Sequence, residues 1–233
     1  TVSDPSASYQ YAYDDLQRVT GITNKGTPGV PPTTLTYTYD EDDHITAVAV
    51  LVNNSLVLTT SYIYDPTTER LESVRQSGPD VSSIRVDFTY LSSAYELSSI
   101  TRYSDLAGTQ LVATSAYGYS PSNQIASLVH ANAAGNTIDS FSLSYDGANR
   151  IVTATDPDGM VTYTYYADNQ IENVHYTDPA QTSQDFAYDP GGDRASGTAV
   201  YGPDNELLSD SLYTYAYDKE GNLISRTTIA DGS

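Results

Sequence analysis

The sequence contains no cysteine, no tryptophan and only one methionine. Without cysteine there can be no disulfide bonds, no thiol nucleophile and no metal site built on thiolates. Only 10 lysine and arginine residues stand against 30 aspartate and glutamate residues, a formal net charge of −20. This balance argues against nucleic acid and anionic lipid as partners, because both require clustered basic residues. No apolar run approaches the roughly 20 residues of a membrane helix, so no membrane insertion is expected.

Tyrosine, by contrast, is abundant and regularly placed. The 233 residues include 22 tyrosines, and 39% of all residues are hydrophobic, which is typical of a folded chain. A signature of two aromatic residues separated by one residue, with Leu143 in place of one aromatic, recurs nine times and is followed by a turn. Its copies are spaced by 20 to 29 residues, so the chain is a repeat protein. The second aromatics form a predicted ladder: Tyr13, Tyr39, Tyr64, Tyr90, Tyr119, Tyr145, Tyr165, Tyr188 and Tyr217.

Each repeat predicts two β-strands. In residues 34–39 the apolar Leu35, Tyr37 and Tyr39 alternate with threonines, which is the period of a strand. Tight turns follow, as in residues 146–149 and 218–222, because Asp bonds its own backbone and Gly and Asn accept positive φ. A second strand and a looser turn, as in residues 150–154 and 156–159, complete the unit. The sequence shows no sustained helical period, so essentially no helix is expected.

These hairpins predict an all-β fold. A lone hairpin is marginal in water, so each must pair with the next. We therefore expect one array of about nine hairpins over residues 1–233, in a single long antiparallel sheet that coils because wide sheets twist. The ladder tyrosines are expected to be mostly buried on its inner face. Both ends, a polar lead before Tyr9 and a turn at residues 230–233, read as cut, so we expect a segment of a longer protein with unpaired terminal strands.

Three segments carry a resemblance to a known family: YAYDDLQRVTGIT at residues 11–23, LSYDGANRIVTAT at 143–155 and YAYDKEGNLISRT at 215–227. They resemble the YD repeat of the Rhs (rearrangement hot spot) family, which includes bacterial toxins, shell subunits of insecticidal toxin complexes, and teneurins. The resemblance implies hairpins joined into one spiralling sheet, which in some members closes a hollow shell. Leu91, Ser120 and Tyr166 depart from the pattern by replacing its Asp. Residues 156–159 and 189–192 echo the Asp-Pro-x-Gly elements of the family's self-cleaving core, but the surrounding block is missing, so self-cleavage is not expected.

Few residues suggest chemistry. His44, His130 and His175 lie in different repeats without a metal-binding spacing, so a zinc site would need them to meet in space. No nucleophile elbow, phosphate loop or dinucleotide motif occurs. We therefore expect no enzyme activity and no cofactor. The acidic run at residues 40–43 is a calcium candidate with Asp40, Asp42 and Asp43 as ligands, although a solvated turn is the interpretation that we favour.

The sequence therefore favours a non-catalytic structural β-scaffold in a large secreted or cell-surface bacterial protein, as part of a fibre or of a shell wall. Its expected partners are flanking repeats of the same polypeptide or neighbouring copies. One alternative, implied by the resemblance, is a wall piece of a cocoon that encloses a toxic domain. Another is an adhesive or carbohydrate-binding module that uses exposed tyrosines and the acidic turns. The extracellular or cell-surface location is an expectation of the same kind.

Overall fold

The structure is a computed structural model that describes residues 2–4, 7–25, 27–91, 95–189, 191–195, 198–202 and 204–229, with the backbone alone at residues 2–4 and 7. All regular structure in these ranges is β-strand, which confirms the all-β prediction. The same residues include no helix that could span a membrane. The expected closing turn at residues 230–233 lies outside the described residues, as do Thr1, Pro190 and Pro203.

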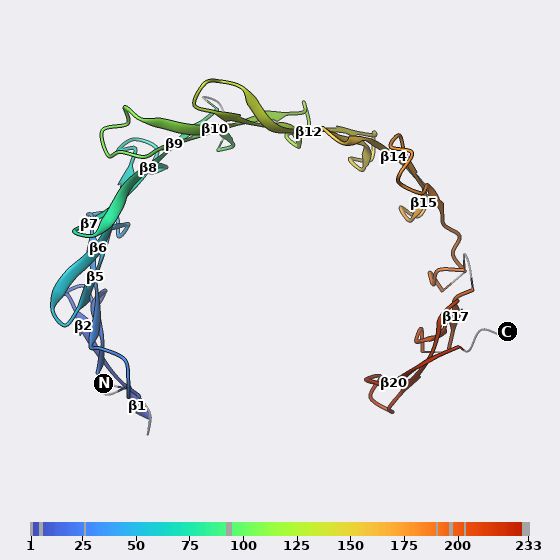
Figure 1. Cartoon of the computed structure of the whole chain (residues 1–233), viewed down its shortest axis with the longest axis horizontal. Coiled ribbons are helices and arrows are strands. Elements are labelled where there is room, and N and C mark those ends of the chain that lie inside the picture. Colours follow the sequence, from blue (N-terminus) through green and yellow to red (C-terminus); the bar gives the residue numbers. More distant parts are fainter. Residues whose placement is uncertain are drawn as a thin grey trace. The chain divides into compact units, whose positions relative to one another are not determined.

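The chain forms two compact units, Thr1–Ser140 and Phe141–Ser233. In the first unit, β1 to β11 lie side by side in chain order, each antiparallel to the strand before it (Figure 1). These strands are β1 (Val2–Asp4), β2 (Ala7–Tyr13), β3 (Val19–Lys25), β4 (Thr33–Tyr39), β5 (Ile45–Val52), β6 (Ser55–Tyr64), β7 (Leu71–Gly78), β8 (Val81–Tyr90), β9 (Leu97–Tyr103), β10 (Leu111–Tyr119) and β11 (Ile125–Asn132).

The second unit has two groups of strands. β12 to β16 again pair in chain order, and β17 to β20 form a separate four-stranded sheet. The strands are β12 (Thr137–Tyr145), which begins in the first unit, β13 (Ile151–Asp156), β14 (Gly159–Tyr165), β15 (Ile171–Tyr176), β16 (Gln184–Asp185), β17 (Val200–Tyr201), β18 (Leu207–Ser209), β19 (Tyr213–Tyr217) and β20 (Leu223–Thr228). The strand–turn–strand repeat is thus present in both units, and the single array over residues 1–233 stays a prediction.

The signature strands all end in the same way. Eight of them, β2, β4, β6, β8, β10, β12, β14 and β19, end at the second aromatic residue. In the first hairpin Ala12 pairs with Gly21 but Tyr13 pairs with Val19, so Thr20 is an extra residue on the return strand. The same register shift precedes the tyrosine in the other seven hairpins. Each hairpin therefore carries a β-bulge at its tyrosine, which bends the return strand there.

The Asp of the signature closes the turn. Asp14 Oδ1 accepts the backbone N–H groups of Leu16 at 3.0 Å and Arg18 at 2.9 Å. The fourth turn residue has positive φ, as at Gln17 with 65°. The turns at Asp146 and Asp218 are built in the same way, with Asn149 at 63° and Gly221 at 80° in the left-handed position. The Asp side chain therefore has a local role, replacing water at the otherwise unpaired N–H groups of the turn.

Across β2 to β6, one row of opposed residues is apolar, and the neighbouring row on the other face is small and polar. Directly opposed residues share a face. One row of such pairs runs through Tyr11, Ile22, Leu35, Val50 and Leu58. The neighbouring row, on the other face, runs through Ala12, Gly21, Thr36, Ala49, Thr59 and Ser77.

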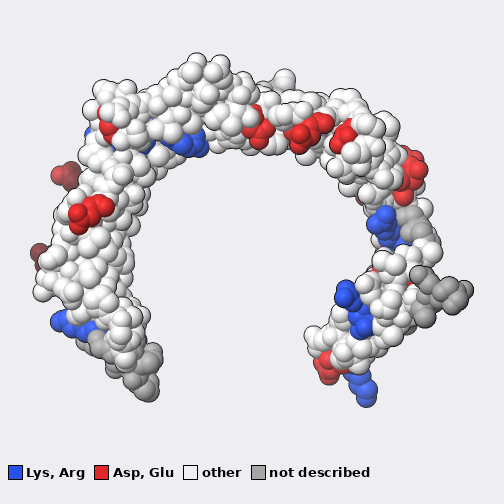
Figure 2. Space-filling view, viewed as in Figure 1, with Lys and Arg blue, Asp and Glu red and all other residues white. Residues whose placement is uncertain are grey.

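Neither unit has a thick core. Among the residues whose burial is described, only Gly21, Ser73, Ser115 and Val174 are buried. The side chains cover one another within one layer, and the apolar face stays half-buried. On the face seen in Figure 2, charged side chains occur as separate patches on an otherwise uncharged surface in both units. The expectation of mostly buried tyrosines is therefore wrong in degree, because the described strands form single layers with no second described layer packed over them.

Candidate functional site

The joints between successive hairpins form the most regular site in the molecule. The hydroxyl of a signature tyrosine donates a hydrogen bond to the backbone carbonyl of the first residue in the preceding return strand. At least six such bonds occur among the described residues: Tyr39 to Val19 at 2.7 Å, Tyr64 to Ile45 at 3.2 Å, Tyr90 to Leu71 at 2.9 Å, Tyr119 to Leu97 at 2.9 Å, Tyr165 to Ile151 at 2.7 Å and Tyr217 to Leu207 at 3.0 Å. We call this contact the tyrosine clasp.

The clasp lies where the backbone ladder between hairpins has ended. Between β3 and β4 the last pair toward the signature turn is Gly21 with Thr36, two residues after Val19 and three before Tyr39. Between β9 and β10 the last pair is Ser99 with Ala116, with the same offsets from Leu97 and Tyr119. The strands separate beyond these pairs, and the carbonyl at the start of the return strand has no strand partner on that side. The tyrosine hydroxyl supplies the donor that this carbonyl needs.

A second contact accompanies the clasp. We call the residue just before each return strand the turn-exit residue, and at four joints it packs over the ring of the next signature tyrosine. The Arg18 guanidinium lies 4.6 Å from the Tyr39 ring centre, and Arg150 lies 4.5 Å from that of Tyr165. A guanidinium over a tyrosine face is a cation–π contact, so ring and hydroxyl both join the hairpins. The other members of this series are Arg70 over Tyr90 at 5.3 Å and His44 stacked on Tyr64 at 4.6 Å.

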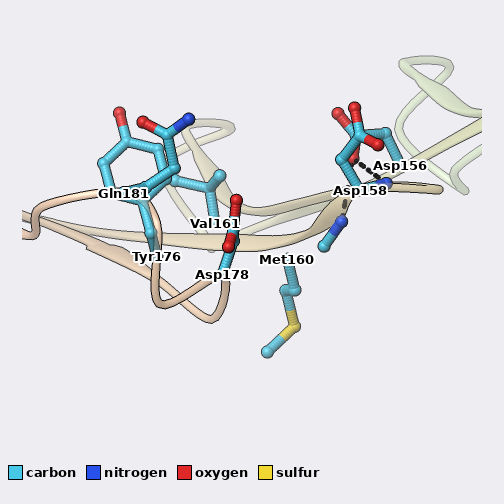
Figure 3. Close-up of a pocket in the computed structure, with 8 residues that line it drawn as sticks. Asp156, Asp158, Met160, Val161, Tyr176, Asp178 and Gln181 are labelled. Atoms are coloured by element: carbon cyan, nitrogen blue, oxygen red, sulfur yellow. Dashed lines mark hydrogen bonds between the residues drawn. The ribbon is translucent and has the colours of Figure 1, made fainter.

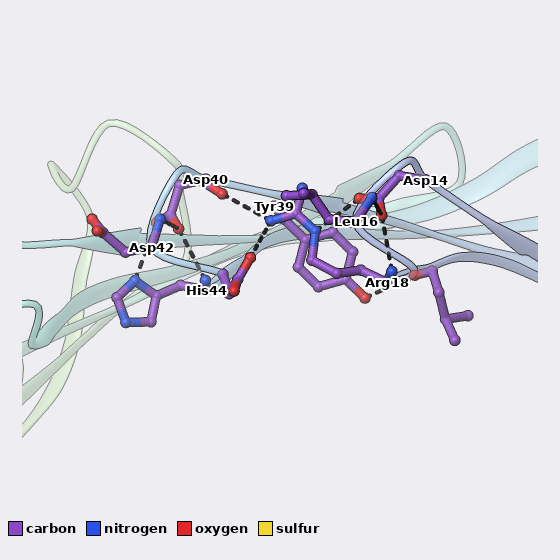
Figure 4. Close-up of polar contacts among 9 residues, drawn as sticks. Asp14, Leu16, Arg18, Tyr39, Asp40, Asp42 and His44 are labelled. Carbon is purple, nitrogen blue, oxygen red and sulfur yellow. Dashed lines mark hydrogen bonds and ion pairs between the residues drawn. The ribbon is translucent and has the colours of Figure 1, made fainter.

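The turn-exit arginines also bind their own turn. Arg18 Nε lies 2.7 Å from Asp14 Oδ2, and Arg18 also donates to the Asp40 carbonyl at 3.1 Å in the next turn (Figure 4). Arg150 repeats this arrangement, 2.7 Å from Asp146 and 3.2 Å from the Tyr166 carbonyl. Both arginines therefore connect two successive turns through charged hydrogen bonds, which are stronger than neutral ones.

The ionisation of these groups follows from their contacts. The hydrogen bond from the Arg18 side chain lowers the pKa of Asp14, although partial burial opposes it. Hydrogen bonds from the backbone and side chain of Arg150 lower the pKa of Asp146 in the same way. Burial raises the pKa of the clasp tyrosines Tyr64 and Tyr119. The carboxylates are therefore ionised and the phenols protonated at neutral pH, as the ion pairs and the clasps require.

Two of the nine predicted ladder tyrosines, Tyr13 and Tyr188, differ from these six, whereas Tyr145 also has a partner. Tyr13 is 59% exposed, and no hydrogen bond of its hydroxyl is found in the described part of the chain. Tyr145 is half-buried at the end of β12. Tyr188 is not in a strand: it makes an isolated bridge with Arg194, and its ring lies edge-on to Tyr166 at 6.2 Å. The eighth copy of the signature is thus not a regular hairpin, and its return segment Asp193-Arg194-Ala195 lacks good β-forming residues.

The predicted calcium ligands do not gather as expected. Asp43 turns away from the other two carboxylates and binds Arg18 at 2.5 Å. His44 takes its place: one ligand atom each of Asp40, Asp42 and His44 lie within 4.8 Å of one another. Figure 4 shows Asp42 and His44 on one side of this turn and Arg18 on the other. The structure thus groups Asp40 and Asp42 with His44 in place of Asp43, and calcium binding at this turn stays a prediction.

The other histidines lie in different units, His130 in the first and His175 in the second. Ser115 Oγ is 2.8 Å from His130 Nδ1 and accepts a hydrogen bond from Arg102 at 2.8 Å. Ser115 has no exposed surface, so its hydroxyl could not meet a substrate. His175 bonds Ser183 through Nδ1 at 3.0 Å. The Ser115–His130 pair therefore serves the sheet, as a satisfied polar group on its apolar face.

A small hollow occurs at the looser turn between β13 and β14. It encloses about 210 Å³ and is lined by Asp156, Asp158, Tyr176, Asp178 and Gln181, among others. Figure 3 shows Asp156 and Asp158 together on one side and Tyr176 with Gln181 on the other. Asp156 Oδ1 accepts the N–H groups of Asp158 and Gly159, so the first Asp-Pro-x-Gly segment is an ordinary turn cap. Asp189 caps its turn similarly, through Gly191 at 2.8 Å and Asp193 at 3.0 Å.

Neither models of known protein families nor curated protein sequences give a match to this chain. Solved structures do match. The chain aligns over 97% of its length with the crystal structure of TcdB2-TccC3, at 13% identity and a TM-score of 0.67. It aligns over 96% of its length with the Tc holotoxin pore of Photorhabdus luminescens, at 12% identity and a TM-score of 0.67. It spans only 13% and 12% of the length of those chains.

The hairpin repeat with its tyrosine clasps and this likeness agree on one class of protein. The chain shares its fold with a stretch of the Tc toxin structures, which supports the relation to YD-repeat proteins that the signature predicted. At 12 to 13% identity the likeness establishes the fold alone.

Proposed function

We propose that the chain is a non-catalytic structural β-scaffold, a stretch of wall in a larger, secreted or cell-surface YD-repeat protein. The observation that carries this proposal is the repetition of the clasp at six joints, with donor–acceptor distances between 2.7 and 3.2 Å. A chain that repeats one joint builds a sheet that extends hairpin by hairpin. The likeness to TcdB2-TccC3 favours a shell wall over a fibre.

The proposed coil follows from the same joints. Six joints have a backbone ladder at one end and a clasp at the other, and eight hairpins have a bulge at the signature tyrosine. A bend repeated with the same sense turns a sheet steadily in one direction. We therefore infer that the hairpins continue as one coiled sheet around a space, in which a wall piece would enclose a cargo domain.

The outer edge of β2 supports flanking repeats as the partners of this chain. β1 pairs with β2 only at Ala7–Tyr9. In the β3–β4 joint the preceding strand likewise pairs with the first part of β4 and stops three residues before Tyr39. The segment β1 thus lies where a preceding return strand would lie. The ring of Tyr13 is exposed, at the position from which other signature tyrosines make a clasp. A further YD hairpin, from the same polypeptide or a neighbouring copy, fits this edge.

Electron microscopy of the native protein that contains this chain tests the scaffold. We expect hollow particles with a wall one sheet thick, and solid compact particles would contradict the proposal. Particles of a variant with Tyr90→Ala and Tyr119→Ala should open or fail to assemble, because both clasps and the contact of Arg70 with the Tyr90 ring are lost. Particles with Tyr117→Phe should stay closed, since no hydrogen bond of that hydroxyl occurs among the described residues. Filaments instead of shells would assign the chain to a fibre.

The hollow beside Tyr176 is the observation that favours the carbohydrate-binding alternative. A half-buried aromatic ring with carboxylates and an amide around it has the chemistry that recognises a single sugar ring. A glycan array probed with the whole chain tests it. Binding that is lost in Tyr176→Ala and kept in Tyr117→Ala would support this role, and an array without binding would remove it.

A further inference from the structure

Not every joint has an arginine at the turn exit: His44, Glu96 and Gln124 hold this position before β5, β9 and β11. In the joints at Arg18 and Arg150, a guanidinium lies on the next tyrosine ring and neutralises the Asp of its own turn. In the second hairpin this place is taken by His44, whose ring stacks on Tyr64 at an angle of 21°. The imidazole thus stands where a guanidinium stands at Arg18 and Arg150, beside the carboxylates of Asp40 and Asp42.

The donor atoms of this turn suit a metal ion. His44 Nδ1 lies 3.2 Å from Asp40 Oδ2, and a ligand atom of Asp42 lies within 4.8 Å of both. Donors around a tetrahedral zinc ion lie about 2.0–2.2 Å from the metal and therefore roughly 3.3–3.5 Å apart. The His44–Asp40 pair is already near this separation. Asp42 is exposed and can close the remaining gap by a change of side-chain rotamer.

The surroundings favour a cation as well. A hollow of about 390 Å³ opens beside this turn, and its lining includes Glu41, Asp65 and Glu69 in addition to the three donors. No lysine or arginine is among the described residues that line it. The nearest guanidinium of the preceding turn, that of Arg18, is engaged with Asp14 and Asp43. The hollow leaves room for the water molecules that complete the coordination of a three-donor site.

We propose that Asp40, Asp42 and His44 form a binding site for a divalent transition-metal ion, with zinc as the probe. The imidazole donor selects such an ion over calcium, which prefers oxygen ligands alone. A metal bound to His44 would place positive charge beside the Tyr64 ring, where the arginines place it in other joints. The site would therefore complete the joint between the β4–β5 hairpin and the β6–β7 hairpin.

Zinc binding to the whole chain tests the proposal. Titration calorimetry with Zn²⁺ alone should show one site, and NMR should show the imidazole signals of His44 shifting while those of His130 and His175 stay in place. Asp42→Asn should weaken binding by about tenfold or more, because it removes a ligand. Asp42 is exposed and its side chain caps no turn, so this variant folds. Glu41→Gln, an adjacent acid outside the donor set, is the matched control and should bind within about twofold of wild type.

His44→Arg provides a second, independent arm. It introduces the residue found at the Arg18, Arg70 and Arg150 positions, so the joint should stay closed while zinc binding is lost. Calcium added in equal amount should not displace zinc. The proposal is overturned if zinc binds equally to wild type, Asp42→Asn and His44→Arg, if it shifts another histidine instead, or if no heat and no shift are seen. Displacement by calcium would also overturn it, since the site would then be carboxylates alone.

Discussion

Removing one hydroxyl group tests the clasp most directly. Tyr119→Phe keeps the aromatic ring and deletes only the oxygen that donates to the Leu97 carbonyl at 2.9 Å. Leu97 is the first residue of β9, and the ladder to β10 begins only at the Ser99–Ala116 pair. The substitution therefore leaves this carbonyl without its protein donor while every backbone pair of the joint stays in place.

The expected effect is small and local. A neutral hydrogen bond contributes about 0.5–1.5 kcal/mol net. The joint is half-buried, so water can partly replace the hydroxyl, and the lower end, about 0.5–1 kcal/mol, is the better expectation. A loss of this size makes local opening about two to five times more frequent. Because hairpins in a repeat array contact only their neighbours, the change should be confined to β9, β10 and the strands beside them.

Native-state hydrogen exchange measures this opening residue by residue. The backbone amides at the start of the β9–β10 ladder should exchange about two to five times faster in Tyr119→Phe. Tyr117→Phe is the matched control, because it removes a hydroxyl from the same strand for which the described residues show no hydrogen bond. Equal changes in both variants would mean that loss of any tyrosine hydroxyl weakens the sheet. No change in Tyr119→Phe would mean that the clasp adds nothing, and the reasoning would be wrong.

Three further predictions address other parts of the joint. Arg150→Lys should raise the rate of amide hydrogen exchange around Tyr165. The lysine loses the planar stack on the ring, worth about 0.5–1 kcal/mol, and the forked hydrogen bonds of the guanidinium. An unchanged exchange rate would argue against the cation–π contact. Gly78→Ala should destabilise the β6–β7 hairpin by about 1–3 kcal/mol, because its Cβ would clash with the Val57 carbonyl oxygen. Gly147→Ala is the control, since a Cβ there meets nothing within 4 Å. Equal melting temperatures of the two variants would refute the prediction. Acid should also weaken the turns: the pKa values of Asp14 and Asp146 are lowered from 3.8, so their contribution is complete above that value and is lost as pH falls through the lower folded-state values. Thermal unfolding between pH 5 and pH 2 should show this loss, and Asp146→Asn should make it smaller.

Much of the hairpin could be predicted from local sequence. The alternation in residues 34–39 and the turn residues after Tyr39 predicted the end of β4, and seven other strands end at the corresponding aromatic. These features depend on period and turn chemistry, which act over a few residues. The exception, Tyr188, has the signature but follows the two-residue strand β16 and precedes a poor return strand. A signature alone is therefore not sufficient where its partner strand is weak.

The joint could not be predicted in the same way, because it depends on register between hairpins. Which carbonyl Tyr39 reaches is set by the bulge at Tyr13 and by where the β3–β4 ladder ends. The sequence did carry a signal for the ring contact: a basic residue follows the turn Asp by four or five positions at Arg18, Arg70 and Arg150. That signal gains its meaning only when the next hairpin is in place. The degree of burial was also misjudged. The regular spacing of the tyrosines predicted an inner face, but it did not predict that the sheet is one layer thick.

The tyrosine and the aspartate of the signature have separate roles, and this explains which departures the repeat tolerates. At Ser120 the hydroxyl accepts the same two turn N–H groups at 3.2 Å, and Tyr119 still clasps. At Leu91 and Tyr166 no such cap is available from the side chain, yet Tyr90 and Tyr165 still clasp at 2.9 and 2.7 Å. The Asp acts within one turn, where serine or water can replace it. The clasp joins two hairpins through the last residue of one strand and the first residue of another, so turns on both edges can vary in length while the joint stays the same.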